Sequence, residues 1–382
     1  MRKIGCVCLA LVLMMSLLPL AASAVELNVA GKAAVLMDAA TGTVLYEKNA
    51  HERLAPASVT KVMTMLLIME AIDSGKIGWN DMVTASETAA AKGGSQIYLK
   101  AGETMSVTDM LKSIAVSSAN DAACAMAEHI AGSESAFVAL MNQRAKELGM
   151  NDTNFVNCTG LDDDPEAKDH VTSAYDIAVM SRELLVKHPD IKKFTTIWMD
   201  TVRGGSFGLA NTNKLVRFYQ GCTGLKTGFT SSAGYCLSAS ACRDGMELIA
   251  VVLGAENSQD RFHACKQMLD YGFANFALVE PELAGAYSVP VKLGAADTVA
   301  AVPVALPQFL IDKAQRGEVT TQVVLEDMVT APVSQGQKLG VMTIKAGDQV
   351  LAQVNMVAQT AVPRLTWWQI FIRILKRITM AA

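Results

Sequence analysis

Two residues at the start of a predicted helix have the types and the spacing of a nucleophile and its base. Ser58 and Lys61 lie three positions apart in the run Ser58-Val59-Thr60-Lys61, so one helical turn places the hydroxyl and the amine on the same face. A serine becomes a nucleophile when a base takes its proton, and a lysine is such a base when burial keeps it neutral. Backbone N–H groups at a helix start also stabilise negative charge that develops in the reaction. The pattern predicts acyl transfer through Ser58.

Two further motifs supply groups that this chemistry needs. Ser118-Ala119-Asn120 adds a hydroxyl that can relay a proton and an amide that can hold a substrate amide or the lysine. Lys226-Thr227-Gly228 adds a positive charge, a hydroxyl and a glycine shortly before a predicted strand. An edge strand at that place would pair with an extended peptide, and the glycine would permit close approach. Each motif alone is weakly specific, but the three together in this order predict one active site.

The motifs must be positioned by secondary structure, and the sequence predicts two β-hairpins with a series of helices between them. A turn-rich link joins predicted strands at Ala33–Met37 and Thr43–Glu47. A second hairpin is predicted from Tyr235–Ala241 and Glu247–Leu253 across Arg243-Asp244-Gly245. Helices are predicted, in chain order, at Val62–Ile72, Asp109–Ala131, Glu134–Leu148, Ala174–Lys187 and Gln259–Phe276. We expect the hairpins to pair into one antiparallel sheet with helices on both faces, an α+β fold.

Beyond Pro281 the pattern changes to short, valine-rich, alternating runs separated by glycine turns. This pattern predicts a small β domain over residues 281–363, in which only Gln308–Arg316 favours a helix. Residues 25–280 would form the larger domain that carries the three motifs.

Both ends of the chain carry membrane-related patterns. Residues 1–24 have a short basic start, an apolar core and small residues at Ala22-Ser23-Ala24, which predicts a cleaved export signal, with an uncleaved anchor as the alternative. In residues 364–382, apolar side chains recur at helical spacing, four residues are basic and none is acidic. This amphipathic pattern predicts a helix on an anionic membrane surface. A terminal helix packed on its own domain is the alternative.

Composition excludes several classes of protein. With 382 residues, 51% hydrophobic and 18% charged, the chain is long enough for two folded domains and is neither disordered nor of low complexity. The net charge of −4, with no basic run before the last segment, argues against nucleic-acid binding. The six cysteines beyond the export signal form no C-x-x-C pair and no zinc-ligand spacing, so no metal or cofactor is predicted. Whether these cysteines form disulfides stays open.

In these features the chain resembles the low-molecular-mass penicillin-binding proteins that are D-alanyl-D-alanine carboxypeptidases (serine peptidase family S11). The resemblance rests on the three ordered motifs, on Gly224-Leu225-Lys226-Thr227-Gly228-Phe229-Thr230 followed by Ala233-Gly234-Tyr235, on the β domain and on the tail. It implies a β-lactamase/transpeptidase-like fold and removal of the terminal D-alanine from peptidoglycan stem peptides ending in D-Ala-D-Ala. It also implies covalent inhibition by β-lactams and a place at the outer face of the cytoplasmic membrane.

The resemblance also implies a role for each catalytic position. Ser58 would be acylated by the penultimate D-alanine carbonyl, with Lys61 as the base for the attack. Ser118 and Asn120 would shuttle protons and position the substrate amide. Lys226 would assist electrostatically, and water would then resolve the acyl-enzyme.

Substrate binding would involve the strand that carries the third motif. Thr227 would hydrogen-bond the terminal carboxylate beside Gly228, and the backbone N–H groups of Ser58 and Phe229 would form the oxyanion hole. Phe229 replaces a polar residue that some members of the family have at this place. Arg261 resembles the family's carboxylate-contacting arginine, with a surface ion pair as the alternative.

Two other functions share some of these features. A β-lactamase has the same motifs, but the sequence contains no E-x-x-L-N element to supply a deacylating carboxylate, and a secreted lactamase has little use for a second domain and an anchor. A catalytically silent wall-binding protein is the other alternative, against which the intact set of motifs argues.

Overall fold

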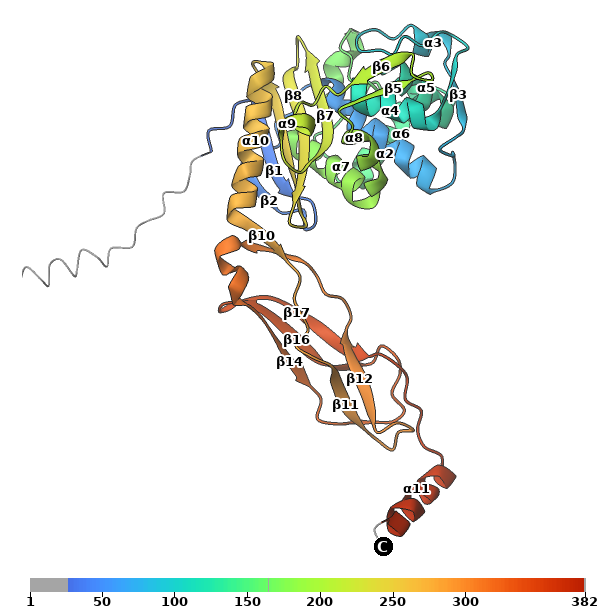
Figure 1. The fold of residues 1–382 in the computed structure, drawn as a ribbon, viewed down its shortest axis with the longest axis vertical. Helices are drawn as coiled ribbons and strands as arrows, with labels where there is room; N and C mark the ends of the chain where they lie inside the picture. The colour runs from blue at the N-terminus through green and yellow to red at the C-terminus, as the bar shows by residue number, and fades with distance from the viewer. Residues whose placement is uncertain (1–26, 164, 381–382) are drawn as a thin grey trace, which may run out of the picture.

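The computed structural model describes residues 27–163 and 165–380. A sheet covered by helices forms the first part of the chain, a β-rich part extends away from it, and a helix lies at the far end (Figure 1). The predicted export signal, residues 1–24, lies outside the described residues.

The central sheet has five antiparallel strands and places the third motif at its edge. In spatial order the strands are β2 (Val44–Lys48), β1 (Ala33–Asp38), β9 (Met246–Ala255), β8 (Gly234–Arg243) and β7 (Cys222–Thr230). β1 joins the two hairpins, since Val35 faces Glu47 of β2 on one side and Val251 of β9 on the other. The predicted pairing of the two hairpins is therefore confirmed. In the part of the chain that the structure describes, β7 pairs with a strand on one side only, and an edge of this kind can pair with an extended peptide.

Helices cover both faces of this sheet, as predicted. The helices of this part are α2 (Lys61–Asp73), α3 (Glu87–Ala90), α4 (Val107–Ser117), α5 (Asn120–Ala131), α6 (Glu134–Glu147), α7 (Ala174–Lys187), α8 (Lys192–Thr195), α9 (Leu215–Phe218) and α10 (Ser258–Asn275). Along β1, Val35 packs in the core that α2 and α7 share, while Leu36 packs in the core beneath α10. Since successive side chains of a strand point to opposite faces, a strand buried on both faces is apolar throughout.

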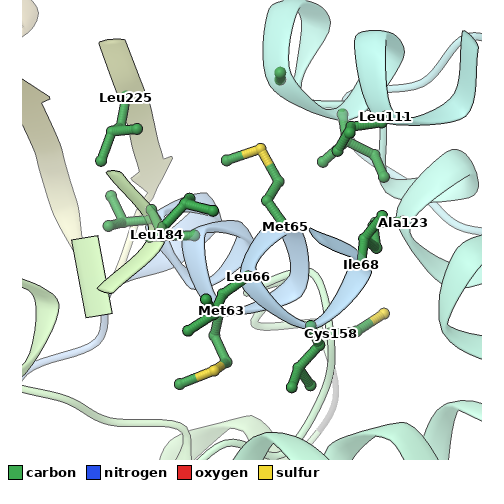
Figure 2. Close-up of a cluster of buried hydrophobic side chains, with 14 of the residues drawn as sticks. Met63, Met65, Leu66, Ile68, Leu111, Ala123, Cys158, Leu184 and Leu225 are labelled. Carbon is green, nitrogen blue, oxygen red and sulfur yellow. The ribbon is translucent and has the colours of Figure 1, made fainter. Parts of the chain in front are cut away.

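Helix α2 is the centre of the larger core. Its side chains Met65 and Ile68 lie among Leu111 of α4 and Ala123 of α5, as Figure 2 shows. Ten of its thirteen residues are buried, so the helix is enclosed on nearly all sides rather than on a single stripe. The residue at its first position, Lys61, is therefore held in a fixed, dry environment.

Short elements complete the first part of the chain. They are the 3-10 helices η1 (Ala57–Thr60), η2 (Pro165–Asp169) and η3 (Pro189–Ile191), and two small antiparallel pairs, β3 (Met82–Thr84) with β4 (Thr104–Ser106) and β5 (Met199–Val202) with β6 (Phe207–Ala210).

The second part is a six-stranded sheet with its own core. Its spatial order is β14 (Val319–Leu325), β16 (Lys338–Ala346), β17 (Gln349–Ala358), β12 (Thr298–Pro303), β11 (Tyr287–Lys292) and β15 (Val329–Thr330). Buried side chains such as Val289, Met342 and Met356 form a cluster separate from the two around the first sheet. β10 (Phe276–Val279), which directly follows α10, pairs with β13 (Phe309–Asp312). The predicted α+β fold with a C-terminal β part is thus confirmed.

Two of the predicted helices differ in the structure. Gln308–Arg316 was expected to be helical, but β13 and the 3-10 helix η4 (Lys313–Glu318) occupy this segment. The prediction was wrong because β13 gains a partner strand, β10, that comes from a distant part of the chain. The continuous helix predicted over Asp109–Ala131 is also wrong, because it divides into α4 and α5 at Ser118.

The last helix, α11 (Trp367–Met380), begins directly after a segment that pairs with the second sheet. Thr366 and Gln369 form a reciprocal cap at its start, in which the Gln369 side chain accepts from the Thr366 backbone N–H at 2.8 Å. In residues 27–163 and 165–380, no helix is both long and apolar enough to cross a membrane.

Candidate active site

The turn before α2 places the Ser58 hydroxyl against the Lys61 amine. Pro56 precedes the 3-10 turn Ala57–Thr60, and α2 then begins at Lys61. The Lys61 Nζ lies 3.0 Å from the Ser58 Oγ and donates to the backbone carbonyl of Thr159 at 2.7 Å. The structure therefore brings the two residues of the first motif into direct contact and adds a third group, Thr159, that fixes the direction of the amine.

Burial makes the neutral form of this amine accessible. Lys61 is fully buried, and desolvation lowers its pKa from 10.5 to about 7, although Cys158 and Asp121 oppose the shift. A lysine in water would have on the order of one amine in 10³–10⁴ neutral at pH 7, whereas about half are neutral at a pKa near 7. The site thus holds an amine that is able to accept the Ser58 proton at neutral pH.

The second motif sits at a sharp break between two helices. Ser118 has a left-handed backbone conformation (φ 63°) at the end of α4, and Asn120 is the first residue of α5. This break ends α4 at Ser118 and starts α5 at Asn120, and both polar residues are almost completely buried. α4 and α5 each pack on α2, which places the break beside the helix of the first motif.

Asn120 has one side-chain atom without a partner. Its Nδ2 donates to the carbonyl of Gly93 at 2.7 Å, and its backbone N–H donates to Ser95 at 2.7 Å. Its Oδ1 is buried and, among the described residues, has no hydrogen-bond partner. A buried acceptor left unpaired is costly, so this oxygen is suited to accept a hydrogen bond from a bound amide N–H or from an ammonium group.

The third motif lies on β7, and its glycine lets this strand contact the turn Ala57–Thr60, which carries Ser58. A side chain at Gly228 would place its Cβ 2.7 Å from the Pro56 carbonyl oxygen and 3.1 Å from the Ser58 backbone nitrogen. Contacts this short exclude any larger residue. Gly228 therefore brings β7 against the N–H of Ser58, so the first and third motifs lie side by side.

Lys226 and Thr227 flank this contact. The Lys226 amine is buried and donates to the Thr227 carbonyl at 2.8 Å, while the Thr227 hydroxyl donates to that of Thr212 at 2.6 Å. Burial first, and then the charges of Lys61 and Arg261, hold the pKa of Lys226 well below 10.5. Because the charge of Lys61 acts on Lys226, the two lysines share one electrostatic environment.

Arg261, on α10, is buried behind β7 instead of forming a surface ion pair. Its guanidinium donates to the carbonyls of Gly228 at 2.8 Å and Cys236 at 3.3 Å, and it lies over the ring of Tyr235. Among the described residues no carboxylate forms an ion pair with it, so the ion-pair alternative is wrong. Phe229 is 52% exposed and stacks against Tyr235 at 4.3 Å between ring centres.

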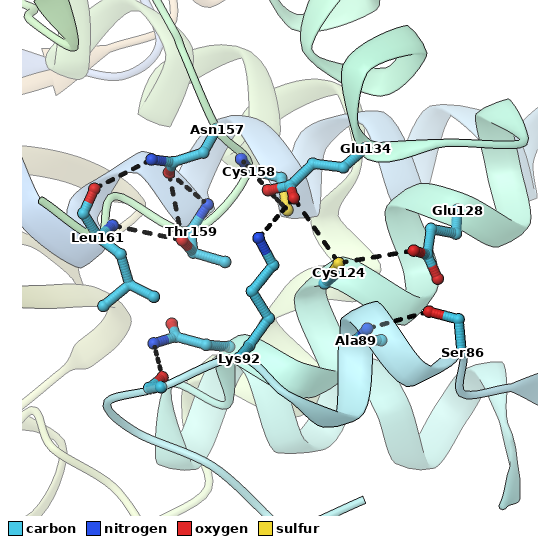
Figure 3. A network of polar contacts seen from close by, with 12 residues as sticks. Ser86, Ala89, Lys92, Cys124, Glu128, Glu134, Asn157, Cys158, Thr159 and Leu161 are labelled. Atoms are coloured by element: carbon cyan, nitrogen blue, oxygen red, sulfur yellow. Dashed lines mark hydrogen bonds and ion pairs between the residues drawn. The ribbon is translucent and has the colours of Figure 1, made fainter. Parts of the chain in front are cut away.

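Sequence reasoning missed the segment that holds Lys61. Asn157 organises this segment, because its Oδ1 accepts from the backbone N–H groups of Thr159 at 3.1 Å and Gly160 at 2.7 Å (Figure 3). Gly160 (φ +79°) packs against the turn Ala57–Thr60, since a Cβ added at Gly160 would lie 1.9 Å from the Ala57 carbonyl oxygen. The run Asn157-Cys158-Thr159-Gly160 is a turn signal, but nothing in it points to a lysine ninety-eight residues away.

The described residues contain no group of three or more His, Cys, Asp or Glu side chains placed to hold a metal ion. The six cysteines whose pairing the sequence left open are free thiols, at positions 124, 158, 222, 236, 242 and 265.

Comparison with known proteins identifies the family. Residues 20–257 match the family model for D-alanyl-D-alanine carboxypeptidases (peptidase S11). The chain belongs to this family. Residues 283–364 match the model for the C-terminal domain of penicillin-binding protein 5. The predicted family and the predicted type of enzyme, a serine D-Ala-D-Ala carboxypeptidase, are thereby confirmed.

Individual relatives cover most of the chain. It is 45% identical over 340 residues to the D-alanyl-D-alanine carboxypeptidase DacF of Bacillus subtilis, across 87% of this chain and 86% of the relative. It is similar in structure to penicillin-binding protein 5 of Haemophilus influenzae, with a TM-score of 0.74, 31% identity and coverage of 88% and 98% of the two chains. It also resembles penicillin-binding protein D2 of Listeria monocytogenes in the ampicillin-bound form, with a TM-score of 0.57, 33% identity and coverage of 65% and 99%.

Proposed function

We propose that Ser58 is the nucleophile and Lys61 the base of this carboxypeptidase. The observation that carries the proposal is the buried amine held between the Ser58 Oγ and the Thr159 carbonyl, with its pKa near 7. The Ser58 proton passes to Lys61 as the Oγ–C bond to the penultimate D-alanine carbonyl forms. The C–N bond to the terminal D-alanine then breaks, and the leaving amine takes the proton. Water cleaves the ester and regenerates Ser58.

The remaining motif residues act on the substrate in this proposal. The peptide pairs with the free edge of β7, and the unpaired Oδ1 of Asn120 accepts from its amide N–H. Ser118 relays the proton to the leaving amine. The N–H of Ser58, against which Gly228 packs, forms the oxyanion hole together with the N–H of Phe229.

The terminal carboxylate of the substrate would lie near the third motif. The Thr227 hydroxyl donates to it in place of the Thr212 hydroxyl. The positive charges of Lys226 on β7 and of Arg261 on α10 attract it. Arg261 donates to the carbonyl of Gly228, so we assign it first to supporting the strand and, through its charge, to attracting the carboxylate.

The test compares wild type with Ser58→Ala on two substrates. Wild type should release free D-alanine from a tripeptide ending in D-Ala-D-Ala and should form a covalent penicillin adduct that mass spectrometry places on Ser58. Ser58→Ala should do neither. Ser74→Ala, at the other end of α2, is the matched control and should keep both activities. Labelling retained in Ser58→Ala would mean that another residue is the nucleophile.

The lifetime of the adduct distinguishes a carboxypeptidase from a β-lactamase. We expect a long-lived penicillin adduct, because no element that would supply a deacylating carboxylate was found in the sequence. Rapid turnover of penicillin, with no adduct that accumulates, would instead favour β-lactamase activity. Failure of wild type to label at all would favour a catalytically silent protein.

We further propose that the chain is exported and that α11 binds the outer surface of the cytoplasmic membrane. Trp367 and Trp368 are 67% and 65% exposed, and Phe371 stacks on Trp367 at 5.8 Å between ring centres. Exposed aromatic side chains beside basic residues favour the interface of an anionic bilayer. The separate core of the second sheet supports domain limits near residues 280 and 363, with the anchor as residues 364–382.

Vesicle binding tests the anchor. The full chain should sediment with vesicles that contain phosphatidylglycerol and bind less to vesicles of phosphatidylcholine alone. Deleting residues 364–382 should leave an unbound protein with full D-alanine release, and replacing Trp367 and Trp368 by serine should weaken binding. Association that survives the deletion would contradict the assignment.

A further inference from the structure

One buried histidine lies behind the active site, and the mechanism above does not use it. His170 directly follows the 3-10 helix η2 and is 3% exposed. Its ring packs edge-on against Phe155 at 5.7 Å between centres. Both of its ring nitrogens have hydrogen-bond partners in the structure, so the ring has one defined orientation.

The partners determine which nitrogen carries the proton. The Nδ1 faces two backbone donors, the N–H groups of Val156 at 3.1 Å and Asn157 at 3.4 Å. A nitrogen that accepts hydrogen bonds has no proton, so the neutral ring is protonated at Nε2. The Nε2 then donates to the Thr60 Oγ1 at 2.8 Å, and the Thr60 hydroxyl donates onward to the Ala57 carbonyl at 2.8 Å.

The Nε2 side of the ring supports the nucleophile. Ala57 directly precedes Ser58 and has a left-handed backbone (φ 48°), a conformation that costs about 1–3 kcal/mol for a residue with a side chain. Such a turn persists when its surroundings hold it. The chain of bonds from His170 through Thr60 fixes the Ala57 carbonyl, and the backbone of Gly160 packs closely against the same carbonyl and the Thr60 hydroxyl.

The Nδ1 side of the ring supports the base. Val156 and Asn157 begin the turn that ends at Thr159, whose carbonyl accepts from Lys61. The same turn is attached to α2 at a second point, because the Thr64 hydroxyl donates to the Cys158 carbonyl at 2.6 Å. The ring of His170 therefore bonds to both segments that place the reacting groups, one carrying Ser58 and one orienting Lys61.

We infer that His170 is a positioning residue for acyl transfer, which sets the distance between the Ser58 hydroxyl and the Lys61 amine by bonding to the turn of each. The inference rests on the proposed roles of Ser58 and Lys61. Displacement of a reacting group by about 1 Å costs on the order of 10²-fold in rate, which sets the scale of the effect. The ring touches no reacting atom.

The His170 ring is uncharged in this positioning role. Burial, and then the charge of Lys61, lower the pKa of His170 to about 4. Its hydrogen-bond partners are backbone N–H groups and a hydroxyl, and no carboxylate of the described residues hydrogen-bonds to it. It therefore adds no charge to the site and leaves Lys61 as the group that titrates near pH 7.

Three substitutions separate the two sides of the ring. In His170→Asn the amide oxygen takes the place of Nδ1, and in His170→Gln the amide nitrogen takes the place of Nε2. His170→Phe keeps a buried ring and loses both sets of bonds. His188→Phe is the control, since this histidine hydrogen-bonds Asp73 on the surface between α2 and α7.

The measurements are the second-order rate constant for acylation by a fluorescent penicillin, its pH profile, and the melting temperature of each variant. His170→Phe should acylate about 10–100-fold more slowly with a displaced break in the pH profile, while His170→Asn and His170→Gln should each restore part of the rate. His188→Phe should match wild type.

Two results would overturn the inference. One is a folded His170→Phe that acylates at the wild-type rate with the wild-type pH profile. The other is an equal loss in all three variants that follows their melting temperatures while the break in the pH profile stays in place, which would make His170 a structural residue only. If wild type itself fails to label, the proposed function fails instead, so the two failures are distinct.

Discussion

Acylation of Ser58 should follow the ionisation of Lys61, because only the neutral amine accepts the hydroxyl proton. With a Lys61 pKa of about 7, roughly 1% of the amines are neutral at about pH 5 and roughly half at about pH 7. We therefore expect the rate constant for acylation by penicillin to rise about 50-fold over this interval. Above about pH 7 it should rise less than about twofold.

An unperturbed lysine would give a different profile. The rate would climb about tenfold per pH unit up to about pH 10, and at pH 7 the neutral fraction would be on the order of 10³-fold smaller. The plateau above pH 7 is therefore the direct consequence of burying Lys61 at the start of α2. Neither His170, with a pKa of about 4, nor Cys158, whose pKa is raised well above 9.0, titrates in this range.

The assay is stopped-flow acylation by a fluorescent penicillin from about pH 5 to about pH 9, with mass spectrometry to confirm one adduct per chain. Lys61→Arg is the control, since its guanidinium stays charged, and it should acylate at least about 10³-fold more slowly at every pH. Lys226 is a second buried amine with a lowered pKa. The variant Lys226→Met should therefore keep the break in the pH profile if Lys61 is the group that titrates. A flat profile, or a break that disappears only in Lys226→Met, would refute the assignment of the base to Lys61.

Three further outcomes are expected. Lys61→Met should unfold in urea with a free energy about 2–3 kcal/mol higher than wild type below about pH 7. Wild type is destabilised there because the pKa of Lys61 is lower in the folded state than its unfolded value of 10.5, and the lost hydrogen bonds of Lys61 offset part of the gain. The advantage of the variant should fade as the pH rises toward 10.5. Gly228→Ala should slow acylation on the order of 10²-fold by pushing β7 away from the Ser58 turn, whereas Gly208→Ala in β6, which has open space around it, should not. Arg144→Leu should cost about 1–3 kcal/mol of stability with acylation unchanged, since Arg144 pairs with carboxylates of α2 and α7 that are not part of the three motifs. Equal stability would show that these ion pairs contribute nothing.

Local spacing was enough to predict the first motif. Three positions along a turn separate Ser58 from Lys61, and the structure places their reacting atoms 3.0 Å apart. The strand pairing was also predictable, because the strands of the two hairpins include short, nearly continuous apolar runs that need a sheet with both faces covered. A contact between residues of one segment, such as that of Ser58 with Lys61, can be predicted because the local backbone conformation determines it.

The break at Ser118 was not predictable from the same reasoning. Apolar periodicity continues through Asp109–Ala131, and local propensity favours one helix. The left-handed residue at Ser118 is maintained by tertiary bonds on both sides, including Asn120 to Ser95 and Thr212 to Val116. The burial of Arg261 was not predictable for a related reason, because its carbonyl partners on β7 and β8 come from distant parts of the chain.

The order and types of the motif residues are written in the chain, and they suffice to predict an acyl-transfer enzyme with a serine nucleophile. The protonation state of the base cannot be predicted from the motifs, because a pKa depends on desolvation and on the charges of residues from other segments. Packing of α4, α5 and the Asn157–Gly160 turn around α2 removes water from Lys61 and lowers its pKa to about 7. Chemistry was thus readable from residue identity, whereas the reactivity of the amine arises only when distant segments enclose it.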